Sequence, residues 1–421
     1  MDAVREVARE LGLVFGAVAV SFLITDASGR GLVRLAHVPL ASPNVVPDLP
    51  LVGERREGEE SAAQLPFDGG PEEQALRTQT VQVLTPDAVT PHFTDVGGWR
   101  VLAPVTERGE SMGLLELYLP IEPDREVVAE VGLVAHLLGF VVIANRRHTD
   151  LYEWGQRSQA FSLSAEIQQR LLPSARTCEA AAFTLAAWLE PAASIGGDTF
   201  DYSLARDLLH LSLTDAMGHG VDAALTANLC LGSLRGARRS GMSLLEQASS
   251  TNKALLEYPT SVTDIAFAAG LIGRLDLRAG SLEIVNAGHV PPYLLRHSDL
   301  TTLSLHVNVP FGMFAETNYA STQVTLEPGD RVLFVTDGML ERNPASSSLP
   351  SAIRESRDLH PREVVRALAD RALEAAGHAL PDDATVMCLD WHGMHENLRE
   401  AVSGADLSRA SDPLTKGKTR P

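Results

Sequence analysis

Aspartate-containing turns at the ends of apolar, strand-like segments are the most constraining feature of this 421-residue chain. In the second half, Asp198 follows two glycines, Asp215 ends LHLSLT, Asp337 ends RVLFVT, and Asp382 and Asp383 precede VMCLDW. A carboxylate where a buried strand meets a turn is costly unless it is solvated, paired or bound to a cation. A single Asp-Gly pair is usually just a turn. Four such turns in one stretch of chain predict a shared site.

The ligand chemistry of these turns favours magnesium or manganese. Both ions prefer oxygen ligands, whereas zinc sites use histidine and cysteine. The chain has no H-E-x-x-H motif, and its three cysteines form no CxxC pair. We therefore expect two Mg²⁺ or Mn²⁺ ions. Such a pair activates water near neutral pH and neutralises phosphate charge, so no covalent enzyme intermediate is required.

The pattern of the chain divides it into four parts. Strand-like runs and turn-rich loops alternate at first, which predicts a small α+β domain over 1–122. Residues 123–173 are helical in character, and Pro173 ends the last helix. Long strands separated by helices predict a second domain over 174–393. The polar, aperiodic segment 394–421 is expected to be a disordered tail.

The helical segment contains a weak heptad-like pattern, in which seven residues, here called the linker seam, recur at alternating spacings of three and four. Its members are Leu151, Trp154, Ser158, Phe161, Ala165, Gln168 and Leu172. An amphipathic helix packed on its own domain gives the same pattern. The position between two domains nevertheless favours a signal-carrying linker in a homodimer.

Net charge and hydropathy exclude several partners. The formal net charge of −19 repels nucleic acid and anionic membranes, so neither is expected as a partner. The apolar stretches Leu11 to Ile24 and Val131 to Ala144 are shorter than the roughly 20 residues that a membrane-spanning helix needs. Both are predicted to be core segments. The N-terminus lacks a secretion-signal pattern, and the low cysteine content suits a reducing compartment, so we expect a cytoplasmic protein.

Two segments of the first domain resemble a known sensory family. LPFDGGPEEQALRTQ, followed by VLAPVTERGESMGLLELYLP, is similar to the latter half of a GAF domain. The resemblance implies an antiparallel sheet with helices and a sensory role, with a small-molecule ligand in an apolar pocket. A ligand-free dimerisation domain fits these residues equally well.

The second domain resembles SpoIIE-type members of the PPM phosphatase superfamily over residues 168–391. The motifs occur in the family's order: QQRLLP at 168–173, GGD with FD at 196–201, DAMGHG at 215–220, NAGHVPP at 286–292, GD at 329–330, TDG at 336–338 and DDAT at 382–385. The resemblance implies a β-sandwich flanked by helices, with a dinuclear metal site at one end. The fold class expected for the whole chain is therefore α+β.

The same resemblance implies specific site residues. Catalytic roles fall to Asp198, Asp215 and Asp337, and the metal ligands are Asp198, Asp215, the backbone carbonyl of Ala216, Asp337, Asp382 and Asp383. Within the last pair, the superfamily's Asp-Asn pattern favours Asp382 over Asp383.

Four other positions qualify the resemblance. Thr214 replaces a glycine that usually precedes the second aspartate, and Thr199 replaces a common aromatic. Neither change removes a carboxylate. His219 and His289 lie in glycine-rich turns and are expected to tie loop backbone together by hydrogen bonds rather than to catalyse.

The implied activity is metal-dependent hydrolysis of phosphoserine or phosphothreonine on a partner protein, with a phosphorylated anti-anti-sigma factor of the STAS type as the implied substrate. A cysteine phosphatase requires an arginine six positions after the nucleophile, whereas Arg235 follows Cys230 by five. No GxxxxGK[ST] loop is present. The alternative is a catalytically weak pseudophosphatase that acts as a partner-binding regulatory module.

Overall fold

The computed structural model describes residues 2–26, 29–40, 64–67, 69–86, 98–156, 163–191, 197–218, 220–258, 266–340, 349–377, 380–394 and 403–414. The chain forms two compact units, residues 1–160 with 399–421 and residues 161–398. Both combine helices with largely antiparallel sheets, which confirms the predicted α+β class.

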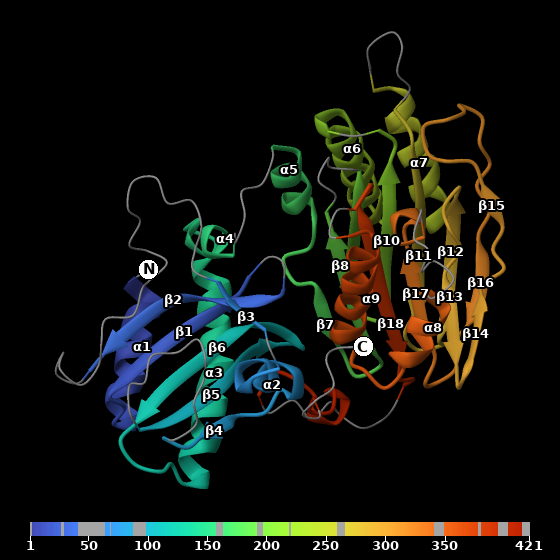
Figure 1. Ribbon diagram of the computed structural model, residues 1–421. Helices are drawn as coiled ribbons and strands as arrows, with labels where there is room; N and C mark the ends of the chain where they lie inside the picture. The colour runs from blue at the N-terminus through green and yellow to red at the C-terminus, as the bar shows by residue number, and fades with distance from the viewer. Residues whose placement is uncertain are drawn as a thin grey trace. The chain divides into compact units, whose positions relative to one another are not determined.

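A six-stranded antiparallel sheet forms the N-terminal unit (Figure 1). Its order is β3-β2-β1-β6-β5-β4, with β1 (Ala19–Thr25), β2 (Gly31–Pro39), β3 (Gln64–Pro66), β4 (Gln82–Leu84), β5 (Trp99–Glu107) and β6 (Glu110–Leu119). Side chains alternate between the faces of a strand. Phe22 and Ile24 therefore pack with α1 (Asp2–Phe15) and α3 (Arg125–Asn145), while Leu23 packs with α2 (Pro71–Thr78).

Helix α3 is longer than the apolar stretch that predicted it. Asp124 caps its N-terminus by accepting from the backbone N–H of Val127 at 2.9 Å. One side of α3 is buried against the sheet, as expected for a core segment, but Leu133, Leu137 and Phe140 are about half exposed. By length and composition α3 could cross a membrane. Its most apolar 18 residues have a mean hydropathy of 2.3, and 33% of them are buried within the protein.

The prediction of a disordered tail is wrong for residues 403–414, which pack on the N-terminal unit. Arg77 Nε donates to the carbonyl of Asp412 at 2.7 Å, and the N–H of Leu414 donates to Gln74 Oε1 at 3.0 Å. Gly404 has a φ of +89°, and a Cβ there would overlap the Thr106 carbonyl. Because these are long-range backbone contacts, they leave no apolar period in the sequence.

The C-terminal unit is a sandwich of two sheets (Figure 1). The first has the order β15-β12-β11-β10-β9, with β16 beside β12, and the second has the order β14-β13-β17-β18-β8-β7. The strands are β7 (Thr177–Glu179), β8 (Phe183–Glu190), β9 (Asp198–Ala205), β10 (Leu208–Ala216), β11 (Ala268–Asp276), β12 (Ser281–Ala287), β13 (Tyr293–Arg296), β14 (Asp299–Thr302), β15 (Val307–Asn308), β16 (Thr322–Thr325), β17 (Arg331–Val335) and β18 (Ala384–Trp391).

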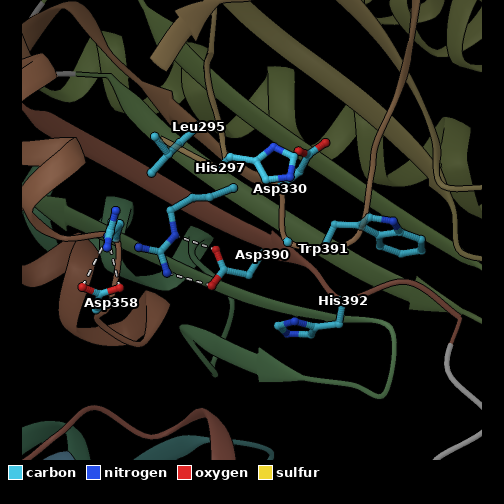
Figure 2. A pocket seen from close by; sticks show the side chains of 10 residues that line it. Leu295, His297, Asp330, Asp358, Asp390, Trp391 and His392 are labelled. Atoms are coloured by element: carbon cyan, nitrogen blue, oxygen red, sulfur yellow. Dashed lines mark hydrogen bonds and ion pairs between the residues drawn. The ribbon is translucent and has the colours of Figure 1, made fainter. Parts of the chain in front are cut away.

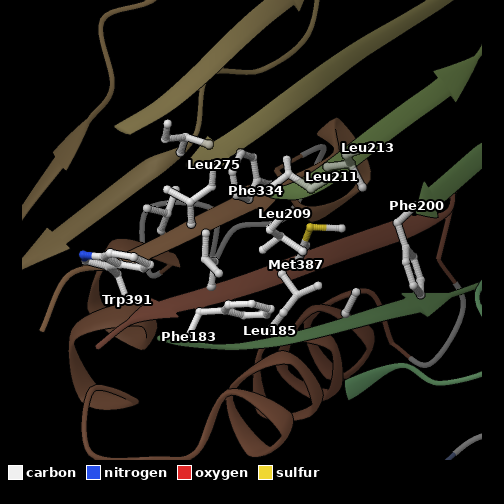
Figure 3. Close-up of a cluster of buried hydrophobic side chains, with 14 of the residues drawn as sticks. Phe183, Leu185, Phe200, Leu209, Leu211, Leu213, Leu275, Phe334, Met387 and Trp391 are labelled. Carbon is white, nitrogen blue, oxygen red and sulfur yellow. The ribbon is translucent and has the colours of Figure 1, made fainter. Parts of the chain in front are cut away.

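Strand alternation builds the layers of this unit. Phe200, Leu213, Phe334 and Met387 point between the two sheets and form their shared core (Figure 3). The opposite faces are covered by α6 (Gly220–Arg239) and α7 (Leu244–Leu256) on the first sheet, and by α8 (Leu349–Glu355) and α9 (Pro361–Ala375) on the second. The central strands of each sheet are thus buried on both faces, whereas the edge strands β14 and β16 are largely exposed.

The described residues of the predicted linker do not form one continuous helix with a heptad-like face. Helix α4 (Leu151–Gly155) and helix α5 (Leu163–Leu171) are separate elements, and Ser158 and Phe161 lie outside the described residues. Ala165, Gln168 and Leu172 are buried in the C-terminal unit. Their spacing reflects packing within that unit, the alternative that the pattern had left open.

Candidate metal centre

Pairing of β9 with β10 brings the first two predicted carboxylates together. Asp198 lies directly opposite Asp215 in the register. The N–H of Ala216 donates to the carbonyl of Gly197 at 3.2 Å. A Cβ on Gly197 would overlap the Ala216 carbonyl, so only glycine permits this close approach. One end of the first sheet therefore carries two carboxylates and the predicted backbone ligand.

Hydroxyl groups of the second sheet hold Asp198. Asp198 Oδ2 accepts from Thr336 Oγ1 at 2.8 Å and from Thr385 Oγ1 at 2.5 Å. Thr336 and Thr385 follow the same alternation as Phe334 and Met387, which lie in the core between the sheets. Asp198 therefore points into the gap between the sheets and is met there from the other side.

Asp383 lies on the Asp198 side of the site. It is 2% exposed, and its Oδ2 accepts from Gln168 Nε2 at 2.5 Å. The same nitrogen donates to the backbone carbonyl of Asp198 at 2.8 Å. A Cβ on Gly338 would overlap the Asp383 carbonyl, so the TDG turn packs tightly against the DDAT segment.

Asp382 lies on the other side, toward Asp337. Burial raises the pKa of Asp382, and the charge of Asp337 raises it further, while the N–H of Asp383 opposes this by donating to Asp382 Oδ1 at 2.8 Å. The sequence pattern favoured Asp382 over Asp383 as a ligand. In the structure each of the two carboxylates interacts with a different part of the acidic cluster.

Burial and like charges raise the pKa of Asp198 well above its ordinary value. Burial is the largest cause, followed by the charges of Asp215 and Asp383. The hydrogen bonds from Thr385 and Thr336 oppose the shift but do not cancel it. Ionised Asp198 is therefore unfavourable until a positive charge is present.

The donor set fits divalent cations. Among the described residues, no three aspartate, glutamate, histidine or cysteine side chains are arranged closely enough to hold one ion together. The ligands present are nevertheless hard oxygen donors, and Asp198 carries an electrostatic penalty that a cation would remove. Magnesium and manganese bind with one or a few carboxylates and retain water, so a closed protein cage is not required.

Of the two histidines in glycine-rich turns, the structure describes His289. His289 Nδ1 bonds the Val290 carbonyl at 3.1 Å, while its own N–H and carbonyl bond the side chain of Asn286. Burial lowers the pKa of His289, which favours the neutral ring. Its expected backbone role is confirmed. His219 and Gly196 lie outside the described residues.

A cysteine nucleophile is excluded at Cys230. The thiol is fully buried in α6, and burial raises its pKa to about 12. Arg235 bonds Asp201 at 2.8 Å, and Arg238 bonds the same carboxylate at 3.0 Å. Asp201 therefore ties β9 to α6 and points away from the acidic cluster, because it is three residues from Asp198 on the strand.

Three polar side chains of the site had no assigned role in the sequence analysis. Thr336 and Thr385 lie within the TDG and DDAT motifs, and their positions on the inward face of each strand could have revealed them. Gln168 begins the QQRLLP motif and was also placed in the heptad-like pattern, because its spacing fits both. Neither pattern indicated that its side chain contacts Asp383.

A hollow lies at the other end of the second sheet (Figure 2). Asp390 at the end of β18 pairs with Arg331 at the start of β17, with Oδ1 2.6 Å from Nε and Oδ2 2.7 Å from Nη2. The acidic cluster lies at the opposite ends of both strands, on the order of 20 Å away at about 3.3 Å per residue. This hollow is thus separate from the acidic cluster.

Comparisons with known proteins found a matching family profile and two similar phosphatases. Residues 205–392 match the profile of the family described as stage II sporulation protein E (SpoIIE). The chain is 22% identical over 283 residues to phosphoserine phosphatase RsbU of Bacillus subtilis, covering 66% of this chain and 83% of RsbU. It is 23% identical to phosphoserine phosphatase RsbP of the same organism, covering 44% of this chain and 45% of RsbP.

Solved structures are similar over about half of the chain. The PP2C phosphatase domain of SpoIIE from Bacillus subtilis, solved with a fragment of its regulatory domain, is 18% identical with a TM-score of 0.44. The match covers 51% of this chain and 65% of that structure.

Replacing Asp198 separates the electrostatic cost of its buried charge from its role in metal binding. We expect Asp198→Asn to unfold in EDTA at the wild-type temperature or above, because a repelled charge is removed. Mn²⁺ at 100 times its Kd should stabilise the wild type by about 2.7 kcal/mol, several degrees in unfolding temperature, but not the variant. Differential scanning fluorimetry measures both quantities.

Asp276→Asn is the matched control, because Asp276 also ends a strand of the first sheet but pairs with Leu208, at the far end of β10 from Asp215. It should keep the wild-type response to Mn²⁺. Equal Mn²⁺ shifts in the wild type and Asp198→Asn would contradict the assignment.

Proposed function

We propose that this chain removes phosphate from phosphoserine or phosphothreonine on a separate partner protein, because residues 205–392 match the SpoIIE family profile and the chain is similar to the phosphoserine phosphatase RsbU. The observation that carries the proposal is the convergence of carboxylates from both sheets on Asp198, which is buried and repelled by its neighbours. A bound divalent cation would remove this repulsion.

Two groups of ligands would hold the ions. Asp198, Asp215, Asp383 and the Ala216 carbonyl lie on one side of the cluster, and Asp337 and Asp382 lie on the other. Since no three of the described carboxylates converge on one point, water would complete the coordination of each ion. Bound Mn²⁺ or Mg²⁺ would supply activation of water and neutralisation of phosphate charge. The protein's own contribution is orientation, because Thr336 and Thr385 fix the Asp198 carboxylate from the opposite sheet.

A protein substrate is supported by apolar side chains next to the cluster. Met217 follows Ala216 directly and is 62% exposed, and Val221 and Leu225 are 42% and 38% exposed on one side of α6. Exposed apolar groups beside an anionic-substrate site contribute nothing to binding a small phosphate ester, but they suit a protein surface. We propose that the phosphorylated protein is a STAS-type anti-anti-sigma factor.

The N-terminal unit is assigned a regulatory, GAF-like role in a cytoplasmic homodimer. Support comes from α3, whose exposed Leu133, Leu137 and Phe140 follow a spacing of four and three and form one stripe. An apolar stripe of this kind is stabilised when a second copy covers it. The same unit's sheet, with helices on both faces, suits a small sensory domain.

Hydrolysis of p-nitrophenyl phosphate tests the activity directly. We expect turnover with millimolar Mn²⁺ and none in EDTA. Asp337→Asn should fall to the background rate while its unfolding temperature in EDTA stays at the wild-type value, because the side chain keeps its shape and only a half-buried charge is lost. Normal Mn²⁺ binding without hydrolysis by the wild type would support the pseudophosphatase alternative instead.

Substitution of the apolar patch beside the cluster tests the protein substrate. Leu225→Glu should lower kcat/KM for a phosphoserine-containing STAS protein about tenfold, as expected for loss of an interface contact, and leave p-nitrophenyl phosphate turnover unchanged. Leu204→Glu is the matched control, since Leu204 is equally exposed at 38% but lies at the far end of β9. Equal losses in the two variants would argue against docking at α6.

Sedimentation of the purified chain tests the homodimer. We expect a dimer at micromolar concentration, and Leu137→Glu should shift the population toward monomer because a charge is buried at the contact. Leu13→Glu on α1 is the control, with 58% exposure against 53% for Leu137. A wild-type monomer that binds lipid vesicles through α3 would contradict both the dimer and the cytoplasmic location.

A further inference from the structure

Gln168 occupies an unusual position on α5, the first described helix of the C-terminal unit. Its side chain is nearly fully buried, with 1% exposure. Its amide nitrogen donates to two acceptors of the acidic cluster, the Asp198 carbonyl at 2.8 Å and Asp383 Oδ2 at 2.5 Å. Since both acceptors require a donor, the orientation of the amide is determined.

The other half of the same amide is not satisfied. Gln168 Oε1 is buried, and no hydrogen-bond partner faces it within the described parts of the chain. A buried acceptor without a partner carries a free-energy cost, so an apolar side chain of the same length would suit a purely structural position better. The donor function of the nitrogen is what this position requires.

The two acceptors belong to different carboxylate residues that repel each other. Burial and the charges of Asp215 and Asp383 act together on Asp198. A neutral N–H₂ group bonded to Asp383 Oδ2 and to the Asp198 backbone holds both residues in place without adding charge. An arginine or lysine there would compete with a cation, whereas an amide does not.

We propose that Gln168 is a positioning residue of the metal centre, which orients the Asp383 carboxylate relative to Asp198 and thereby increases the affinity for a divalent cation. The inference rests on the proposed function, because it assumes that Asp198 and Asp383 bind metal. Residues that orient metal ligands commonly change affinity by about 10- to 100-fold when they are replaced.

Isothermal titration of Mn²⁺ into the full chain tests the proposal without an activity assay. Gln168→Met keeps the length of the side chain and removes the donor, so we expect the Mn²⁺ Kd to rise about tenfold or more. The unfolding temperature in EDTA should change little, because the loss of the two donated hydrogen bonds is offset by removal of an unsatisfied buried oxygen. Should Gln168→Met fail to fold, Gln168→Asn, whose amide is one methylene too short, replaces it with the same expectation.

Gln169→Met is the matched control. Gln169 is the neighbouring glutamine on α5, and its Oε1 accepts from Arg176 at 2.8 Å instead of contacting the carboxylates. Its Mn²⁺ Kd should stay within about twofold of the wild type, below the effect of an orienting residue.

Three outcomes separate the proposals. A wild-type Kd in the Gln168 variant overturns the positioning role and leaves the phosphatase function intact. A lowered unfolding temperature in EDTA, together with unchanged Mn²⁺ affinity once folded, makes Gln168 a structural tie between α5 and β9. Absence of Mn²⁺ binding and of hydrolysis in the wild type overturns the proposed function itself, and this inference with it.

Discussion

The site depends on the hydrogen bonds that Thr336 and Thr385 of the second sheet donate to Asp198 of the first. Strand pairing fixes the register within each sheet, and apolar burial holds the two sheets together without a preferred direction. The hydrogen bonds between the sheets therefore align the start of β9 with the end of β17 and the start of β18. Asp337 and the DDAT segment are placed relative to Asp198 by this alignment, whereas Asp215 and Ala216 are placed by the pairing of β9 with β10.

Such a site reduces the stability of the domain that carries it. Asp198 is buried among like charges, and its raised pKa expresses that penalty. Stability comes instead from the core between the sheets, where Phe183, Leu213 and Phe334 are fully buried, and from the opposite end, where Arg331 bonds Asp390 and two backbone carbonyls. Functional sites commonly depart from the rules that stabilise a fold, and other parts of the domain compensate.

The sequence predicted what is local and missed what is long-range. Asp215 and Asp337 could be assigned because each ends an apolar run, a property visible within ten residues. The partners of Asp198 could not, since Thr385 is 187 positions away. Gln168 was misplaced because heptad spacing and burial against β9 give the same pattern. The tail at 403–414 was missed because side chains of the N-terminal unit hold it by hydrogen bonds to its backbone, which leave no compositional signal in the tail itself.

The two departures from the family pattern, Thr199 and Thr214, form a single unit. They are directly opposite in the register of β9 and β10, and their hydroxyls bond each other at 2.6 Å. Because alternate residues of a strand face opposite sides, this pair points away from Asp198 and Asp215, toward the face that α6 covers. A lone buried hydroxyl would be unsatisfied, whereas the pair satisfies itself. The two departures therefore lie on the α6 side of the sheet, away from the carboxylates.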